Sequence, residues 1–180
     1  MVINTAANLI ASAIFSGTVI ISLCLVVVSL FKIKLTNINK AVLIKAVNIV
    51  LLFGAMIYTV MWVMEIFVAF YSGGEYEQYT LTNRLFGSYW WAAFASLVSS
   101  VLLPQMLWIK KFRSSFSPTI IIISFWLFIN ILAQLPFGIV GILREFRISM
   151  SYLGGLGIYM VMLVSAYMIL NRKVARPIST

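Results

Sequence analysis

Residues 47–70 read VNIVLLFGAMIYTVMWVMEIFVAF, an apolar run with a single charged side chain, Glu65. A helix needs about 20 apolar residues to cross the hydrocarbon core of a bilayer, and this run is long enough. Four other runs of similar character lie before and after it, at about residues 9–31, 85–109, 120–143 and 152–170. We therefore expect an all-α, polytopic membrane helix bundle of about five transmembrane helices, with residues 1–180 forming a single transmembrane domain.

The composition of the chain excludes the main alternatives to a membrane protein. Of the 180 residues, 63% are hydrophobic and only 9% are charged. A soluble domain usually carries about 25% charged residues, and a disordered chain is poor in apolar residues.

Histidine and cysteine counts exclude several kinds of cofactor and catalytic site. The chain has no histidine, and its one cysteine, Cys24, lies inside an apolar run. Imidazole-based catalytic triads, histidine-ligated metals and haem, iron–sulfur clusters and internal disulfides need more of these residues. We therefore expect no haem, iron–sulfur cluster or metal in this chain, so any redox centre lies on a partner or is an organic cofactor.

Charges between the runs predict the orientation in the membrane. The segments after the first and third runs and the C-terminal tail carry only basic charges: Lys32, Lys34, Lys40, Lys45, Lys110, Lys111, Arg113, Arg172, Lys173 and Arg176. The segments after the second and fourth runs mix both signs: Glu75, Glu77, Arg84, Arg144, Glu145 and Arg147. The positive-inside rule places the C-terminus in the cytoplasm and the N-terminus outside. It also explains the net charge of +9 without a nucleic-acid partner.

Glu65 is the first candidate for chemistry, because an ionisable residue within a membrane helix often has a function. It could accept a proton, form an ion pair with Arg84 or Arg144, or extend to the membrane surface. Tyr58 and Trp62 precede it at spacings that place all three side chains on one helical face. Such a face could line a flat ring such as a quinone, or simply pack in the core.

Other positions predict helix packing. Ala13 and Gly17 have the small-residue spacing that lets membrane helices approach closely. Asn130 and Gln134 lie before Pro136, and we expect their amides to form hydrogen bonds across helices. The segment 71–84, YSGGEYEQYTLTNR, is polar and contains adjacent glycines, which predicts an outer loop that could cover a site or dock a partner.

Several short motifs occur together between Glu65 and Arg113. They are Tyr71-Ser72-Gly73, Glu75-Tyr76-Glu77, Asn83-Arg84, Gly87 with Tyr89-Trp90-Trp91, and Pro104-Gln105 with Trp108, Lys110, Lys111 and Arg113. In this combination the stretch resembles the polysulfide-reductase (NrfD-like) membrane subunits, in particular those of bacterial alternative complex III.

The resemblance implies an integral subunit of a respiratory complex in the bacterial cytoplasmic membrane. Such subunits bind a quinone or menaquinone and pass electrons to a peripheral iron–sulfur or haem subunit, beside other membrane subunits and lipid. In this chain Glu65 would accept a proton and Arg84 would orient it. Tyr58, Trp62 and Trp91 would line the quinone ring.

Two alternatives stay open. The chain could be a non-catalytic membrane scaffold or assembly subunit that keeps a reduced NrfD-like bundle, or it could be a small transporter or channel. A quinone site predicts a pocket that touches Glu65 and opens sideways to lipid. A scaffold predicts that Glu65 pairs with Arg84 or Arg144 and that a continuous face of small residues is present for a partner helix. A transporter predicts a polar path through Asn130 and Gln134 to both faces.

Overall fold

The computed structural model describes residues 2–31, 38–71, 73–88, 90–134 and 149–175. These residues are helical apart from short turns, and none of them lies in a strand, which confirms the all-α prediction for the described part of the chain. The elements are α1 (Val2–Leu30), α2 (Lys40–Tyr71), α3 (Glu75–Phe86), α4 (Trp90–Leu97), a π-helix (Val98–Leu102), α5 (Leu103–Gln105), a 3-10 helix (Met106–Trp108), α6 (Lys110–Arg113), α7 (Ser117–Gln134) and α9 (Ser149–Ala175).

Within the described ranges, four segments are long and apolar enough to cross a membrane: Ala6–Leu30, Lys40–Tyr71, Trp90–Trp108 and Gly155–Arg172. They correspond to the first, second, third and fifth runs of the sequence. The fourth run, predicted over 120–143, is represented by a shorter apolar helical segment, Ser117–Leu132. Its later part, including Pro136, and Arg144 after it lie outside the described residues.

Two elements begin earlier than hydropathy alone predicts. The second helix starts at Lys40 and not near residue 47, because Asn39 caps it. The Asn39 Oδ1 atom accepts hydrogen bonds from the backbone N–H groups of Ala41 (3.1 Å) and Val42 (3.3 Å), which would otherwise lack partners in the first turn. The first helix begins at Val2, also ahead of the predicted residue 9.

The segment 71–84 is not the loop that the sequence predicts. Most of it forms α3, which has Glu75 and Glu77 in its first turn and Arg84 in its last turn. This order of charges matches the helix dipole, positive at the N-terminus and negative at the C-terminus. Gly73, at φ 67°, provides the left-handed backbone conformation that turns the chain from α2 into α3.

The third run begins at Trp90 and not at Leu85, and it is irregular inside the membrane-spanning segment. A π-helix occupies Val98–Leu102 and ends two residues before Pro104. Proline has no N–H to donate to the carbonyl four residues earlier, here that of Ser100, and its ring crowds that carbonyl. A local change of hydrogen-bond register relieves this conflict.

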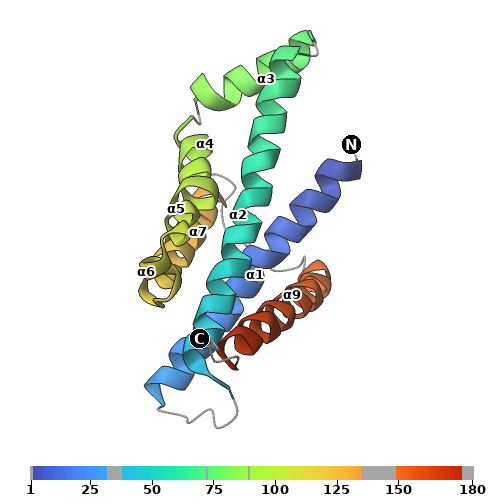
Figure 1. The fold of residues 1–180 in the computed structure, drawn as a ribbon. Helices are drawn as coiled ribbons and strands as arrows, with labels where there is room; N and C mark the ends of the chain where they lie inside the picture. The colour runs from blue at the N-terminus through green and yellow to red at the C-terminus, as the bar shows by residue number, and fades with distance from the viewer. Residues whose placement is uncertain (1, 32–37, 72, 89, 135–148, 176–180) are drawn as a thin grey trace.

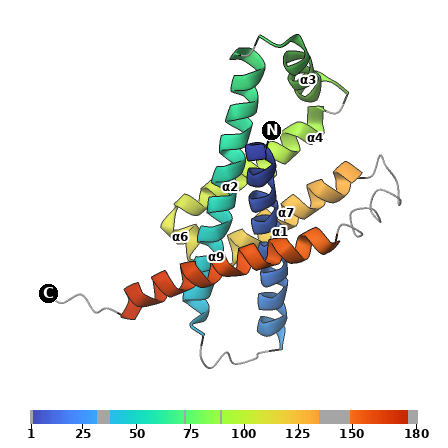
Figure 2. The same ribbon diagram turned by 90° about the vertical axis from the view of Figure 1, so that its right-hand side faces the viewer.

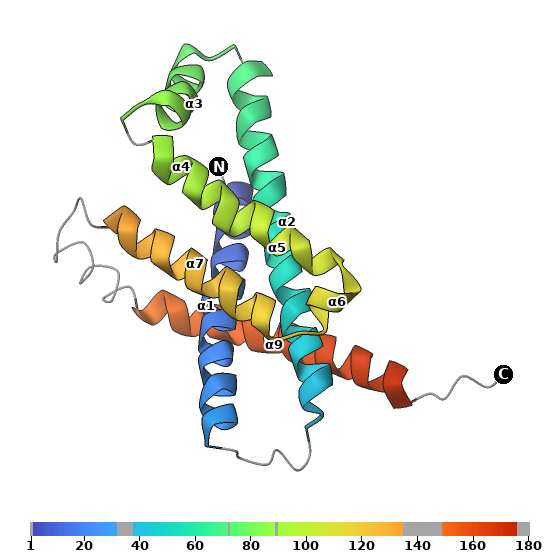
Figure 3. The same cartoon turned by 90° about the vertical axis from the view of Figure 1, so that its left-hand side faces the viewer.

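The helices form two antiparallel pairs and a crossing helix. In Figure 3, α1 and α2 run in opposite directions, and the α4–α6 segment runs opposite to α7 at a slant to the first pair. Figures 2 and 3 show α9 crossing α1 and α2 steeply, and α9 contacts both. At the far end of α2, α3 folds back toward α4 (Figure 1).

The junction of α1, α2 and α9 is packed through small residues. A Cβ atom on Gly17 would lie 2.3 Å from the Tyr159 ring, and one on Gly155 would lie 3.2 Å from the Ala13 Cβ. Tyr159 is fully buried there. The close approach predicted from Ala13 and Gly17 is therefore confirmed, and its partner is α9.

Candidate functional site

A cavity of about 160 Å³ lies between α2, the α4–π-helix segment and α7. Its lining residues are Tyr58, Trp62, Ala92, Ser96, Ser99, Ser100, Trp126, Ile129 and Asn130. Two of them, Ser96 and Asn130, are exposed, so the cavity opens to the outside of the bundle. Tyr58 and Trp62, predicted to share one face of α2, thus line this cavity opposite small residues of the α4–π-helix segment.

Phe15 of α1 positions two of the aromatic walls. Its ring is fully buried and packs edge-on against Tyr58, with ring centroids 5.3 Å apart and planes at 68°. The Trp126 ring lies at the same centroid distance on a tilted plane. These separations are typical of favourable aromatic pairs, so the two walls are held from behind.

Hydrogen-bond donors remain available on the aromatic walls. The Tyr58 hydroxyl and the indole N–H groups of Trp62 and Trp126 have no acceptor in the part of the chain that the structure describes. The hydroxyls of Ser99 and Ser100 instead donate to the backbone carbonyl of Ser96, at 3.1 and 2.6 Å. The cavity therefore suits a ligand that carries hydrogen-bond acceptors.

Asn130 does not form the hydrogen bond across helices that the sequence predicts. Its Nδ2 atom donates to the carbonyl of Trp126 in the preceding turn of α7, at 2.8 Å. Short polar side chains often make such local bonds. The side chain of Gln134 lies outside the described residues.

Glu65 pairs with Arg84, as one of the sequence-based alternatives predicts. Arg84 Nη1 donates to Glu65 Oε1, and the guanidinium carbon lies 5.7 Å from the centroid of the Trp62 ring, within the range of a cation–π contact. The Arg84 and Glu65 side chains are 50% and 45% exposed. Glu65 is not among the residues that line this cavity.

The predicted site residues therefore separate into three groups. Tyr58 and Trp62 line the cavity, whereas Glu65 and Arg84 form an ion pair beside Trp62 and are not part of the lining. Trp91 is partly buried on α4 but is absent from the lining of this cavity. Sequence reasoning did not identify Trp126 or Ser99, because their approach to Tyr58 depends on how α4 and α7 pack.

A second polar centre was not anticipated. Asn48 is fully buried on α2, and its Nδ2 atom donates to the carbonyls of Arg113 and Ser115, both at 2.9 Å. The Thr119 hydroxyl donates to Asn48 Oδ1 at 2.5 Å. An asparagine inside an apolar run is a visible signal, since a buried amide needs partners, but its partners are far away in the sequence.

The described residues contain no group of three or more His, Cys, Asp or Glu side chains that could hold a metal ion. No model of a known protein family matches the chain, and no curated protein matches it.

Proposed function

We propose that this chain is an integral membrane subunit of a redox complex and that it holds a quinone-type ring in the cavity between α2, α4 and α7. The single observation that carries the proposal is the cavity itself, with Tyr58, Trp62 and Trp126 on its walls. The NrfD-like motifs between residues 65 and 113 support the assignment to a respiratory complex.

The size of the cavity suits one ring. An engineered apolar cavity of about 150 Å³ in another protein holds one benzene molecule, and the cavity here measures about 160 Å³. A quinone head group would occupy this volume, and its isoprenoid tail would leave past the exposed Ser96 and Asn130 toward lipid.

The chemistry of the walls suits a quinone more than a plain hydrocarbon. Aromatic faces stack on a flat ring, and quinone carbonyls accept hydrogen bonds. Donors that have no acceptor among the described residues are present on Tyr58, Trp62 and Trp126. Trp62 also contacts Arg84, so a ring bound at Trp62 would lie beside a positive charge.

The lining residues include no carboxylate, so this chain would bind and orient the ring. The two electrons of a bound quinol would pass to a peripheral iron–sulfur or haem partner, and its two protons would pass to water on the open side of the cavity, beside the exposed Ser96 and Asn130. We assign Glu65 to the ion pair that positions Arg84, in place of a proton-acceptor role. The charge pattern favours a C-terminus on the cytoplasmic side of a bacterial membrane.

Filling the cavity tests the proposal. The purified protein in detergent is titrated with menadione, a naphthoquinone without a tail, and saturable quenching of tryptophan fluorescence is measured. Ser96→Phe should weaken binding about tenfold or more, which corresponds to about 1.4 kcal/mol, because the new ring occupies the cavity.

Ser165→Phe is the matched control, since Ser165 is exposed on α9 and away from the cavity. It should bind menadione like the wild type. Equal binding by all three proteins, or no saturable binding by the wild type, would contradict the quinone site.

One observation favours a second function, that of a non-catalytic scaffold for other membrane subunits. Glu65 forms an ion pair with Arg84 outside the cavity, as that alternative predicts. Gentle purification from the native membrane separates the two functions. A stoichiometric quinone with redox subunits supports the quinone site, whereas membrane partners without a quinone support the scaffold.

A further inference from the structure

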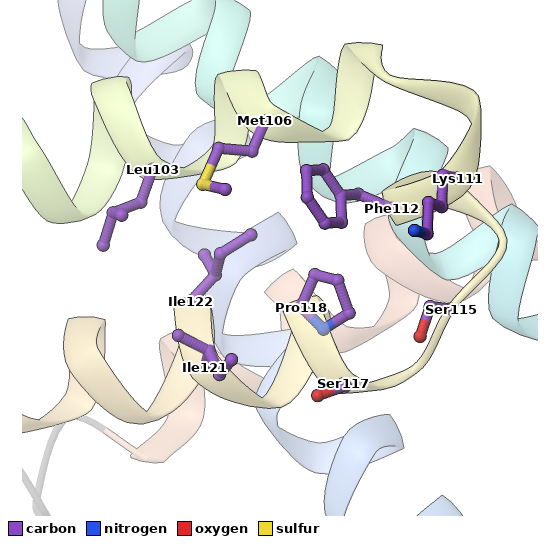
Figure 4. Close-up of a pocket in the computed structure, with 9 residues that line it drawn as sticks. All are labelled: Leu103, Met106, Lys111, Phe112, Ser115, Ser117, Pro118, Ile121 and Ile122. Atoms are coloured by element: carbon purple, nitrogen blue, oxygen red, sulfur yellow. The ribbon is translucent and has the colours of Figure 1, made fainter.

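A second and larger cavity, of about 260 Å³, lies between the Leu103–Arg113 segment and the first turns of α7. Figure 4 shows that its two ends differ in chemistry. At one end Leu103 and Met106 face Ile121 and Ile122. At the other end lie the Lys111 ammonium and the Ser115 hydroxyl.

We propose that this cavity binds an anionic phospholipid, with an acyl chain at the apolar end and the phosphate at Lys111 and Ser115. The site is separate from the quinone-type cavity, and its lining shares no residue with that cavity. The proposal therefore does not depend on the proposed function.

The polar end of the cavity is surrounded by positive charge, which favours an anionic ligand. Lys110 and Lys111 are exposed, and Arg113 follows them in the same short helix, α6. Among the described residues, the acids are Glu65, Glu75 and Glu77, which lie on the outer part of α2 and on α3. None of these carboxylates forms an ion pair with the α6 cations, because the one ion pair in the described part of the chain joins Glu65 and Arg84.

The position of the cavity matches the depth of lipid head groups. The membrane-spanning segment Trp90–Trp108 ends two residues before Lys110. Trp108 is 58% exposed at this boundary, where amphipathic rings are favoured. A lipid whose phosphate lies at Lys111 would direct its chain back along this segment, toward Leu103 and Ile121.

The polar end is held in place before any ligand binds. Asn48 donates hydrogen bonds to the backbone carbonyls of Arg113 and Ser115, and Thr119 of α7 bonds to the same amide. The loop between α6 and α7 is thereby tied to α2. A preorganised site loses less conformational entropy when it binds a ligand.

The apolar end distinguishes a phospholipid from a free phosphate ion. Inorganic phosphate would use only Lys111 and the hydroxyls, and it would leave the surfaces of Leu103, Met106 and Ile121 unfilled. A zwitterionic lipid would fill the apolar end but bring a choline cation close to Lys110 and Lys111. The combination of both ends therefore selects an anionic phospholipid.

Native mass spectrometry of the full chain, released from detergent, tests the site. The protein is titrated with phosphatidylglycerol, with phosphatidylcholine of the same acyl chains, and with inorganic phosphate. We expect a first phosphatidylglycerol to bind several-fold more tightly than phosphatidylcholine. Displacement of this lipid by millimolar phosphate would mean that the phosphate group alone is recognised, and it would overturn the proposal.

Two matched pairs of variants locate the lipid. Lys111→Gln should lower the affinity for phosphatidylglycerol several-fold, whereas Lys40→Gln, which removes an exposed cation at the start of α2, should not. Ile121→Trp should reduce binding by filling the apolar end, whereas Ile120→Trp, outside the lining, should not. Equal effects within either pair, or equal affinity for the two lipids, would overturn the proposal.

Discussion

Two of the polar contacts between distant parts of this chain lie in opposite surroundings: the hydrogen bonds of Asn48 and the Glu65–Arg84 ion pair. Asn48 is fully buried, carries no charge, and uses both amide hydrogens and its oxygen to hold the α6–α7 loop against α2. Glu65 and Arg84 are charged, and about half of each side chain is exposed. Burial, and not charge, decides which contact stabilises the fold more, because an exposed ion pair gains little over its solvated state.

The sharpest way to test this comparison is to remove the buried amide. Asn48→Ala deletes three hydrogen bonds and leaves two carbonyls and a hydroxyl without their partner. We expect the free energy of unfolding to fall by about 2–3 kcal/mol. The measurement is an SDS titration in mixed micelles followed by circular dichroism.

Asn8→Ala is the control for this change, since Asn8 is exposed on α1. It should alter the free energy of unfolding by less than about 0.5 kcal/mol. If the two alanine variants unfold alike, the buried amide does not have the structural role assigned to it.

The turn at Gly73 brings Arg84 back toward Glu65. Gly73→Ala forces an alanine into the left-handed region at φ 67°, which should cost about 1–2 kcal/mol. The same assay should show no loss for Gly157→Ala, because a Cβ on this glycine of α9 meets no atom within 4 Å. If Gly73→Ala left the free energy of unfolding unchanged, the turn between α2 and α3 would not need the left-handed conformation at residue 73.

Thr119→Val removes one of the three hydrogen bonds that Asn48 forms. Thr119→Val keeps the shape of the side chain but removes the hydroxyl that donates to Asn48. We expect a loss of about 1 kcal/mol in the same titration. A double-mutant cycle with Asn48→Ala should show that the two losses are not additive, since the side chains are in contact. Additive losses would argue against the bond.

The smallest effect is expected at the ion pair. Glu65→Gln and Arg84→Gln should each lower the free energy of unfolding by less than about 1 kcal/mol at low salt. The difference from the wild type should shrink further at high ionic strength, because exposed charges are screened. A loss of about 2 kcal/mol or more that salt does not change would reverse the comparison, and it would restore Glu65 as a desolvated, functional carboxylate.

The candidate site was only partly visible in the sequence. Tyr58 and Trp62 could be placed on one face because their spacing is a property of a single helix. Trp91 was grouped with them through the resemblance alone, and the structure keeps it out of the cavity lining. Trp126 joins the site from α7, and Phe15 supports it from α1. The spacing of residues within one helix cannot predict contacts with residues of other helices.

The sequence by itself determined the apolar helices and the small-residue face of α1, because hydropathy and spacing act within one segment. Tertiary structure alone decided that Asn48 reaches Thr119, that Glu65 meets Arg84 outside the cavity, and that α9 crosses α1 and α2. These outcomes depend on helix rotation and crossing, and on the register change ahead of Pro104. They arise from close packing among all the helices together, so no single segment encodes them.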